Sequence, residues 1–163
     1  MSRARALRET LGEGDVPEIR RLVERTGVFS AEEVAIAVEV AATGCAQGPA
    51  SGYRFLLAHD EGRLAGFVAY GPIPATAGSY DLYWIAVDST GQRRGLGGEL
   101  LAAAEARAAA LGARRIYVDT SGRADYAGAR AFYARHGYRC EAVLPDFYAP
   151  GDAKWIFCKT LGA

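Results

Sequence analysis

The sequence predicts an α/β domain in which helices and strands follow in the order ααβββαβαββ. Three features lead to this prediction: two helix-capping patterns near the N-terminus, two extended segments around a glycine turn, and a strand that runs into a glycine-rich turn and an alanine-rich helix. A chain of 163 residues, half of them apolar, has the usual size of one domain. Because no repeat or linker divides it, we expect a single domain over residues 1–163.

Two capping patterns predict the N-terminal helices. Asp15 is followed three residues later by Glu18, and Ser30 by Glu33, so each pair can satisfy free N–H groups of a first helical turn. The second helix should end near Thr43-Gly44, although its β-branched residues would also suit a strand.

Strands and helices then alternate. Residues 53–59 and 63–71 flank Asp60-Glu61-Gly62, where glycine can take a positive φ, and therefore predict a β-hairpin. Residues 80–88 predict a third strand that leads into the glycine turn. The later elements are a helix over 96–111 capped by Gly112, a strand over 114–120, a helix over 127–136 stopped by Gly137, and strands over 138–144 and 154–160. A further strand near the N-terminus stays open.

The composition excludes several classes of protein. Lys plus Arg equals Asp plus Glu at 19 each, so no net field favours nucleic acid or an anionic membrane as a partner. No apolar run approaches the roughly 20 residues that span a bilayer, and no signal peptide is visible. The three cysteines lie far apart without C-x-x-C spacing, which predicts neither disulfides nor a zinc site. We therefore expect a cytoplasmic protein with no membrane or nucleic-acid partner.

The segment from Gly91 to Gly98 is the strongest candidate for a binding site. A strand, a glycine turn and a helix in succession form an anion site, because free amides and the helix dipole meet at the helix start. Gly95 and Gly97 would let the backbone approach a phosphate, and Arg93 and Arg94 would add charge. A tight turn with solvated arginines explains a single G-x-G equally well. The spacing fits neither a P-loop nor a dinucleotide fingerprint, so a nucleotide enzyme is only the runner-up.

Two ordered motifs connect this turn to a known family. The pattern Q/R-x-x-G-x-G/A is matched by residues 92–97 after the strand over 82–87, and A-x-x-F-Y-x-x-x-G-F/Y is matched by residues 129–138. With these motifs the chain, from about Asp15 to its C-terminus, resembles the GNAT superfamily of acyl-coenzyme A-dependent N-acyltransferases. The resemblance implies the GNAT fold, an α/β fold with a mixed, mostly antiparallel sheet flanked by helices.

The resemblance also implies how the cofactor is held. Backbone amides would cradle the coenzyme A pyrophosphate, a role that falls on Arg93, Arg94, Gly95, Leu96, Gly97 and Gly98. The pantetheine arm would pair with the strand at Ile85 and Val87, and a β-bulge would splay this strand from the next to admit the acyl group between Ile85 and Asp119. Tyr126 stands where many members have an asparagine that bonds the cofactor, and its hydroxyl could replace that contact.

The chemistry implied is attack of an uncharged amine on the thioester, without a metal, with an oxyanion held by a backbone amide near Ile85. Tyr133 matches the family tyrosine that protonates the leaving thiolate, although it could be a core aromatic. Asp81 is the first candidate for the base that deprotonates the amine, because it stands six residues before Val87, where histone-type members of the family have a glutamate base. It is also expected to share a strand face with Tyr83 and Ile85. A solvated surface acid is the alternative, and Glu39 and Asp119 are other candidates.

The segment over 145–152 predicts a loop between the last two strands that would shape the acceptor pocket with Asp146, Phe147 and Tyr148, or pack on the core. His136 precedes Gly137 at a helix end, where it would cap the helix. We expect an N-acetyltransferase that moves the acetyl group of acetyl-CoA to a primary amine in a ternary complex. The acceptor could be a small amine, an amino acid or a protein N-terminus. A non-catalytic acyl-CoA sensor is the alternative, and the oligomeric state, a homodimer included, stays open.

Overall fold

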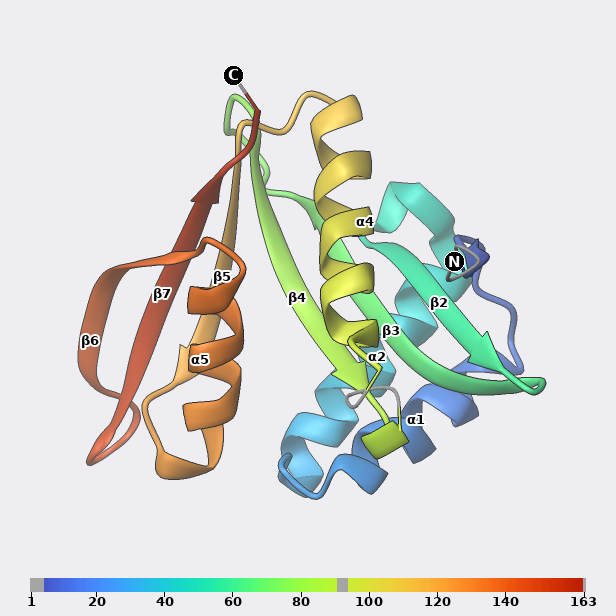
Figure 1. The fold of residues 1–163 in the computed structure, drawn as a ribbon, viewed down its shortest axis with the longest axis horizontal. Coiled ribbons are helices and arrows are strands. Elements are labelled where there is room, and N and C mark those ends of the chain that lie inside the picture. Colours follow the sequence, from blue (N-terminus) through green and yellow to red (C-terminus); the bar gives the residue numbers. More distant parts are fainter. Residues whose placement is uncertain (1–4, 91–93, 163) are drawn as a thin grey trace.

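The computed structural model describes residues 5–90 and 94–162 and contains a seven-stranded sheet in the order β1-β2-β3-β4-β5-β7-β6 (Figure 1). The strands are β1 (Leu7–Arg8), β2 (Arg54–Asp60), β3 (Arg63–Pro72), β4 (Ser79–Val87), β5 (Arg115–Ser121), β6 (Arg139–Ala149) and β7 (Asp152–Thr160). Neighbouring strands are antiparallel except for β4 and β5, which are parallel. The predicted mixed, mostly antiparallel sheet is confirmed, and β1 supplies the strand that the sequence left open.

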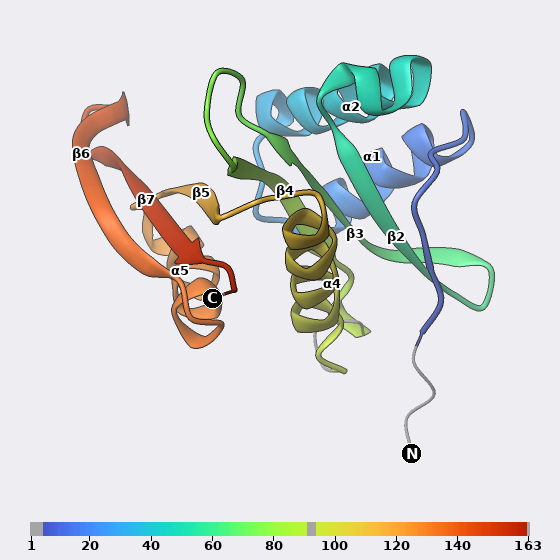
Figure 2. The same cartoon turned by 90° about the horizontal axis from the view of Figure 1, so that it is seen from above.

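Helices cover both faces of this sheet (Figures 1 and 2). On one face, α1 (Asp15–Thr26) and α2 (Ala31–Gln47) pack over β2, β3 and β4, and on the other lie α4 (Leu96–Ala110) and α5 (Ala127–Arg135). Two short 3-10 helices, η1 (Gly48–Ser51) and η2 (Ala124–Tyr126), precede β2 and α5. Each face therefore has its own apolar core. None of the described helices is long and apolar enough to cross a membrane.

The two N-terminal helices begin where the capping patterns predict, but for different reasons. Ser30 and Glu33 form the expected reciprocal capping box at the start of α2. The Asp15 side chain caps no amide of α1; its carboxylate accepts the N–H of Gly12 at 2.6 Å and pairs with Arg8. Gly44 does not end α2, which continues to Gln47. A β-carbon at Gly44 would lie 2.3 Å from the Phe55 ring. This glycine allows helix and sheet to pack closely.

The β2–β3 and β6–β7 hairpins have tight turns. Glu61 and Gly62 have φ values of 50° and 79°, as a two-residue type I′ connection between β2 and β3 requires. The expected loop over 145–152 is wrong, because β6 continues to Ala149 and only two residues separate it from β7. β6 is an edge strand with an irregular register after Leu144, and an edge tolerates Pro145, which lacks an N–H donor.

Candidate active site

The strand before the glycine turn, β4, separates from its neighbour β5 partway along the sheet (Figure 1). The two strands pair from Ser79 with Arg115 to Asp81 with Tyr117, and within the described residues the ladder ends there. Beyond Asp81, the edge of β4 faces β5 without pairing to it. Such an edge can pair with an added extended chain.

A β-bulge in β4 coincides with this separation. Leu82 and Trp84 pair with the consecutive residues Tyr70 and Ala69 of β3, so Tyr83 is the extra residue. A bulge bends its strand and increases the local twist. The β-bulge and the splayed strands that the sequence led us to expect are therefore both present.

The bulge also exchanges the two faces of β4. Leu82 before it, and Ile85 and Val87 after it, all contact the core on the α4 side, whereas Trp84 contacts the core on the α1 side. Asp81 is adjacent to Leu82 and points to the opposite face. The expectation that Asp81 shares a face with Ile85 is therefore wrong, because it assumed unbroken alternation. The opening between β4 and β5 therefore borders both faces of the sheet. α4 and α5 cover one face, and Asp81 points to the other.

The described part of the glycine turn places free amides at the start of α4. Gly95 has φ of 73°, a left-handed conformation, and α4 begins at Leu96. The N–H groups of a first helical turn have no acceptor within the helix, so those of Leu96, Gly97 and Gly98 can bind an anion. The Leu96 side chain is fully buried and leaves only its amide for this role. Arg93, which we expected at the same site, lies outside the described residues.

Gly97 and Gly98 serve helix packing as well. A β-carbon on Gly97 would lie 3.3 Å from the Phe132 ring, and one on Gly98 would lie 2.8 Å from Nε2 of His136. His136 is anchored at the end of α5, where its Nδ1 lies 2.8 Å from the Phe132 carbonyl oxygen. The glycines thus bring the start of α4 against α5, the helix that carries Tyr133.

The side chain of Arg94 turns toward the β2–β3 hairpin, where Nη1 lies 2.7 Å from Oδ2 of Asp60. Beside this ion pair is a polar pocket of about 370 Å³. Its lining residues are Asp60, Glu61, Arg63, Ala65, Asp88, Thr90 and Arg94. Arg63 and Ala65 of β3 line this pocket. Because β3 and β5 lie on opposite edges of β4, the pocket is on the side of β4 away from β5 and the opening.

Tyr133 is buried in the same core as Ile85 and Val87. Its ring contacts Phe132, with centroids 5.4 Å apart, and Tyr138, with centroids 5.7 Å apart. No other described residue forms a hydrogen bond with its hydroxyl, and burial raises the pKa of this phenol. Tyr133 is therefore a core aromatic on the α4 side of the sheet, and its phenol stays protonated at neutral pH.

Three charged residues, Asp81, Asp119 and Lys154, lie near one another on the opposite face of the sheet from Tyr133. Asp81 is half-buried, and its pKa is raised first by burial and then by the negative charge of Asp119, while Lys154 acts in the opposite direction. Nζ of Lys154 lies 2.8 Å from Oδ2 of Asp119 and 4.5 Å from the centroid of the Phe147 ring. Glu39, the other candidate base, is exposed on α2. Lys154 lies outside every sequence motif and was not among the predicted site residues.

The segment over 145–149 contributes aromatic side chains beside this group. The pKa of Tyr148 is raised by burial and then by the negative charge of Asp119, so the two residues lie near each other. Phe147 and Tyr148 contact each other with centroids 5.0 Å apart. Asp146 instead closes the hairpin, because its Oδ1 accepts the N–H of Gly151 at 2.7 Å.

Tyr126, at the end of η2, connects this part of the chain to α2. Its buried hydroxyl donates a hydrogen bond of 2.5 Å to Oε1 of Glu33, the capping residue of α2. Its ring centroid lies 6.2 Å from that of Phe29, which in turn lies 4.7 Å from Trp84. Phe29, on the α1–α2 connection, thus contacts Trp84 of β4, and Glu33, in the first turn of α2, contacts Tyr126. The sequence singled out Glu33 only as a helix cap.

Comparison with known proteins identifies this arrangement. Residues 20–138 match the sequence model of the acetyltransferase (GNAT) family. None of the curated proteins matches the chain in sequence. A GNAT-family protein from Desulfovibrio desulfuricans is 42% identical, with a TM-score of 0.93 over 96% of this chain and 99% of its own.

Two further solved structures share the fold at low sequence identity. An aminoglycoside 6′-N-acetyltransferase in complex with coenzyme A is 17% identical, with a TM-score of 0.75 over 97% of this chain and 98% of its own. The ribosomal-protein-S18-alanine N-acetyltransferase from Escherichia coli is 22% identical, with a TM-score of 0.75 over 97% of this chain and 94% of its own.

Proposed function

Because the chain belongs to the GNAT family of acetyltransferases, we propose that it transfers the acetyl group of acetyl-CoA directly to a primary amine in a ternary complex. The observation that carries this proposal is the separation of β4 from β5 at a bulge, with free amides of α4 at the end of the same strand. This arrangement offers a strand edge to an extended arm and an anion site to a pyrophosphate.

On the α4 side we place the donor. The amides of residues 93–98 would hold the pyrophosphate, and Ile85 and Val87 would pair with the pantetheine arm. The side chain of Arg94 is paired with Asp60, so Arg94 would contribute its amide. The oxyanion would be stabilised by a backbone amide at Ile85 or Ala86. Tyr126 already donates its proton to Glu33, so it would contact the cofactor only as an acceptor.

Tyr133 would donate the proton that the coenzyme A thiolate takes up as it leaves. Its raised pKa keeps the phenol protonated at neutral pH, and the hydroxyl is not used by another described residue. General acids need to lie within hydrogen-bond reach of the atom that they protonate. The position of Tyr133 in the core that also contains Ile85 supports this role.

On the opposite face we place the acceptor. An alkylamine has a solution pKa of about 10.4 and must lose a proton before it attacks. Asp81 would accept this proton, directly or through a water molecule, and its raised pKa makes it a stronger base than an ordinary aspartate. The carboxylates Asp81 and Asp119 and the aromatic rings of Phe147 and Tyr148 suit a cationic acceptor. A small amine, an amino acid and a protein N-terminus all meet this description.

A screen of acceptors tests the proposal. The full chain is incubated with acetyl-CoA and a panel of diamines, amino acids, aminoglycosides and peptides with a free N-terminus, and release of the coenzyme A thiol is followed. We expect saturable release with at least one amine. Saturable binding of coenzyme A without release across the panel would instead indicate a sensor, and stabilisation by NAD or ATP alone would indicate a nucleotide-binding protein.

A further inference from the structure

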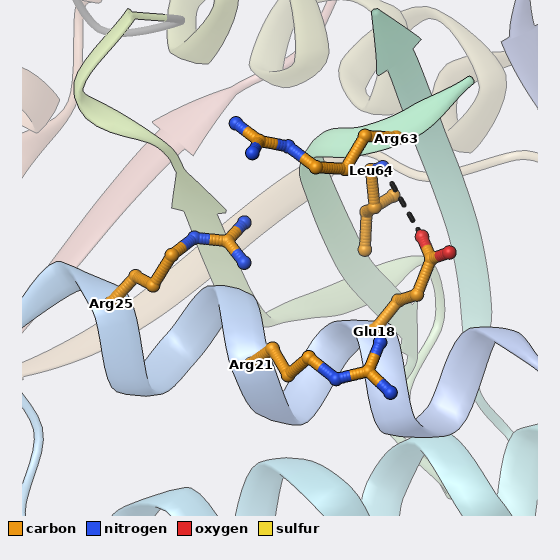
Figure 3. A pocket seen from close by; sticks show the side chains of 5 residues that line it. All are labelled: Glu18, Arg21, Arg25, Arg63 and Leu64. Carbon is orange, nitrogen blue, oxygen red and sulfur yellow. Dashed lines mark hydrogen bonds between the residues drawn. The ribbon is translucent and has the colours of Figure 1, made fainter. Parts of the chain in front are cut away.

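Three arginines surround a small hollow between α1 and the beginning of β3 (Figure 3). Arg21 and Arg25 are one helical turn apart on α1, and Arg63 is the first residue of β3. Leu64 and Glu18 complete the wall. Neither the acetyl transfer site nor the glycine turn includes this hollow.

The charges around the hollow do not balance. Glu18 is held at one side, where its Oε2 accepts the N–H of Leu64 at 3.2 Å. Arg63 lies 3.8 Å from the carboxylate of Asp88. Within residues 5–90 and 94–162, no carboxylate lies within 4.0 Å of the guanidinium of Arg21 or Arg25.

A neighbouring arginine shows the contrast. Arg20, on the same helix, pairs with Glu24 at 3.8 Å. Like charges four residues apart destabilise a helix by about 0.2–0.5 kcal/mol, so Arg21 and Arg25 are an unfavourable pair unless an anion lies between them and Arg63. Three arginines and one carboxylate that is already hydrogen-bonded thus line the hollow, and the guanidinium groups of Arg25 and Arg63 lie near each other (Figure 3).

The size of the hollow limits what can enter it. Its volume is about 70 Å³, whereas pockets for drug-sized ligands have about 300–1,000 Å³. A water molecule occupies about 30 Å³ of the liquid, so the hollow holds a group of a few heavy atoms. Guanidinium groups donate paired hydrogen bonds to the oxygens of phosphates, and guanidinium groups from two elements can contact different oxygens of one tetrahedral anion.

We propose that Arg21, Arg25 and Arg63 form a binding site for a single phosphate group. The group could be free phosphate or a small phosphate monoester. It could also be a phosphate of the coenzyme, because Arg63 also lines the pocket beside Arg94 at the glycine turn. Both sources share the same chemistry, and the site does not depend on the acetyl transfer reaction.

Titration of inorganic phosphate into the full chain tests the site. Calorimetry is performed at constant ionic strength, with chloride replaced by phosphate. We expect saturable binding of one phosphate, weakened about tenfold or more by Arg25→Gln or Arg63→Gln, because each removes charged hydrogen bonds. Arg20→Gln is the matched control, since it removes one positive charge from the same helix outside the hollow, and it should leave the affinity within about twofold.

The affinities for coenzyme A and 3′-dephospho-coenzyme A are compared to identify the source of the phosphate. If the coenzyme supplies it through its 3′-phosphate, Arg25→Gln weakens the binding of coenzyme A but not that of 3′-dephospho-coenzyme A. If the ligand is a free phosphate group, both affinities stay unchanged while phosphate binding is lost. Absence of saturable phosphate binding at constant ionic strength overturns the proposal, as does an equal loss in Arg20→Gln, which would indicate a diffuse charge effect.

Discussion

Nζ of Lys154 lies 2.8 Å from Oδ2 of Asp119, on the face of the sheet to which Asp81 points. Lys154 compensates one of two neighbouring carboxylates and also lowers the pKa of the other. The ion pair joins the start of β7 to β5, the strand that borders the opening opposite β4. The protonation of Asp81 therefore depends on two charged residues of the neighbouring strands.

The first prediction concerns the pH dependence of acetyl transfer. Asp81 must be deprotonated to act as the base, so its pKa sets the acidic limb of kcat/KM. Lys154→Gln removes a charge that lowers this pKa, and the limb should move to higher pH. Asp119→Asn removes a charge that raises it, and the limb should move to lower pH. Shifts in the same direction, or no shift in either variant, would contradict the assignment of Asp81.

Replacement of the base itself gives a second prediction. Asp81→Asn keeps the size of the side chain but cannot accept the amine proton, so kcat should fall about 10²–10⁴-fold while the affinity for coenzyme A stays nearly constant. The matched control is Glu39→Gln, which neutralises an exposed acid on α2. Its kcat should not change. Equal activities of both variants would remove Asp81 from the mechanism.

Tyr133→Phe provides the third prediction. The variant should lower turnover at least about tenfold and leave both unfolding stability and coenzyme affinity nearly unchanged, because the hydroxyl bonds to no other described residue. Tyr138→Phe is the control on the neighbouring ring, whose hydroxyl donates to Oε1 of Glu105 at 3.1 Å. That variant should lose about 0.5–3 kcal/mol of stability and keep its turnover. Wild-type turnover in Tyr133→Phe would show a purely structural tyrosine.

The sequence predicted most of the fold because the signals involved are local. The capping box at Ser30, the positive φ of Gly62 and the left-handed Gly112 each depend on a few neighbouring residues. The extent of β6 was not predictable in this way. Pro145 and Asp146 suggest a loop, and only the position of β6 at the edge of the sheet makes them compatible with a strand.

The site was predictable only where a motif describes it. The glycine turn and Tyr133 lie within two matched patterns, whereas the pairing of Lys154 with Asp119 depends on the register of β5 and β7. Asp81 was placed on the wrong face because one bulged residue, Tyr83, reverses the alternation of β4, and a bulge leaves no clear mark in a single sequence.

The contact between Gly98 and His136 gives the fourth prediction. Alanine favours a helix over glycine by about 1 kcal/mol, but the added β-carbon of Gly98→Ala would lie 2.8 Å from Nε2 of His136. Gly98→Ala should therefore lower stability when His136 is present and raise it in the His136→Ala background, with a coupling of about 1 kcal/mol or more in thermal or denaturant unfolding.

Two roles of Gly98 are separated by the affinity for coenzyme A of the wild type, Gly98→Ala, His136→Ala and the double variant. If the glycine acts by letting α4 meet α5, the double variant should bind coenzyme A about as well as His136→Ala alone. If the β-carbon obstructs the pyrophosphate directly, removal of the imidazole will not restore affinity, and Gly98→Ala will weaken binding equally in both backgrounds. The packing geometry favours the first result, because the nearest atoms to that β-carbon all belong to His136.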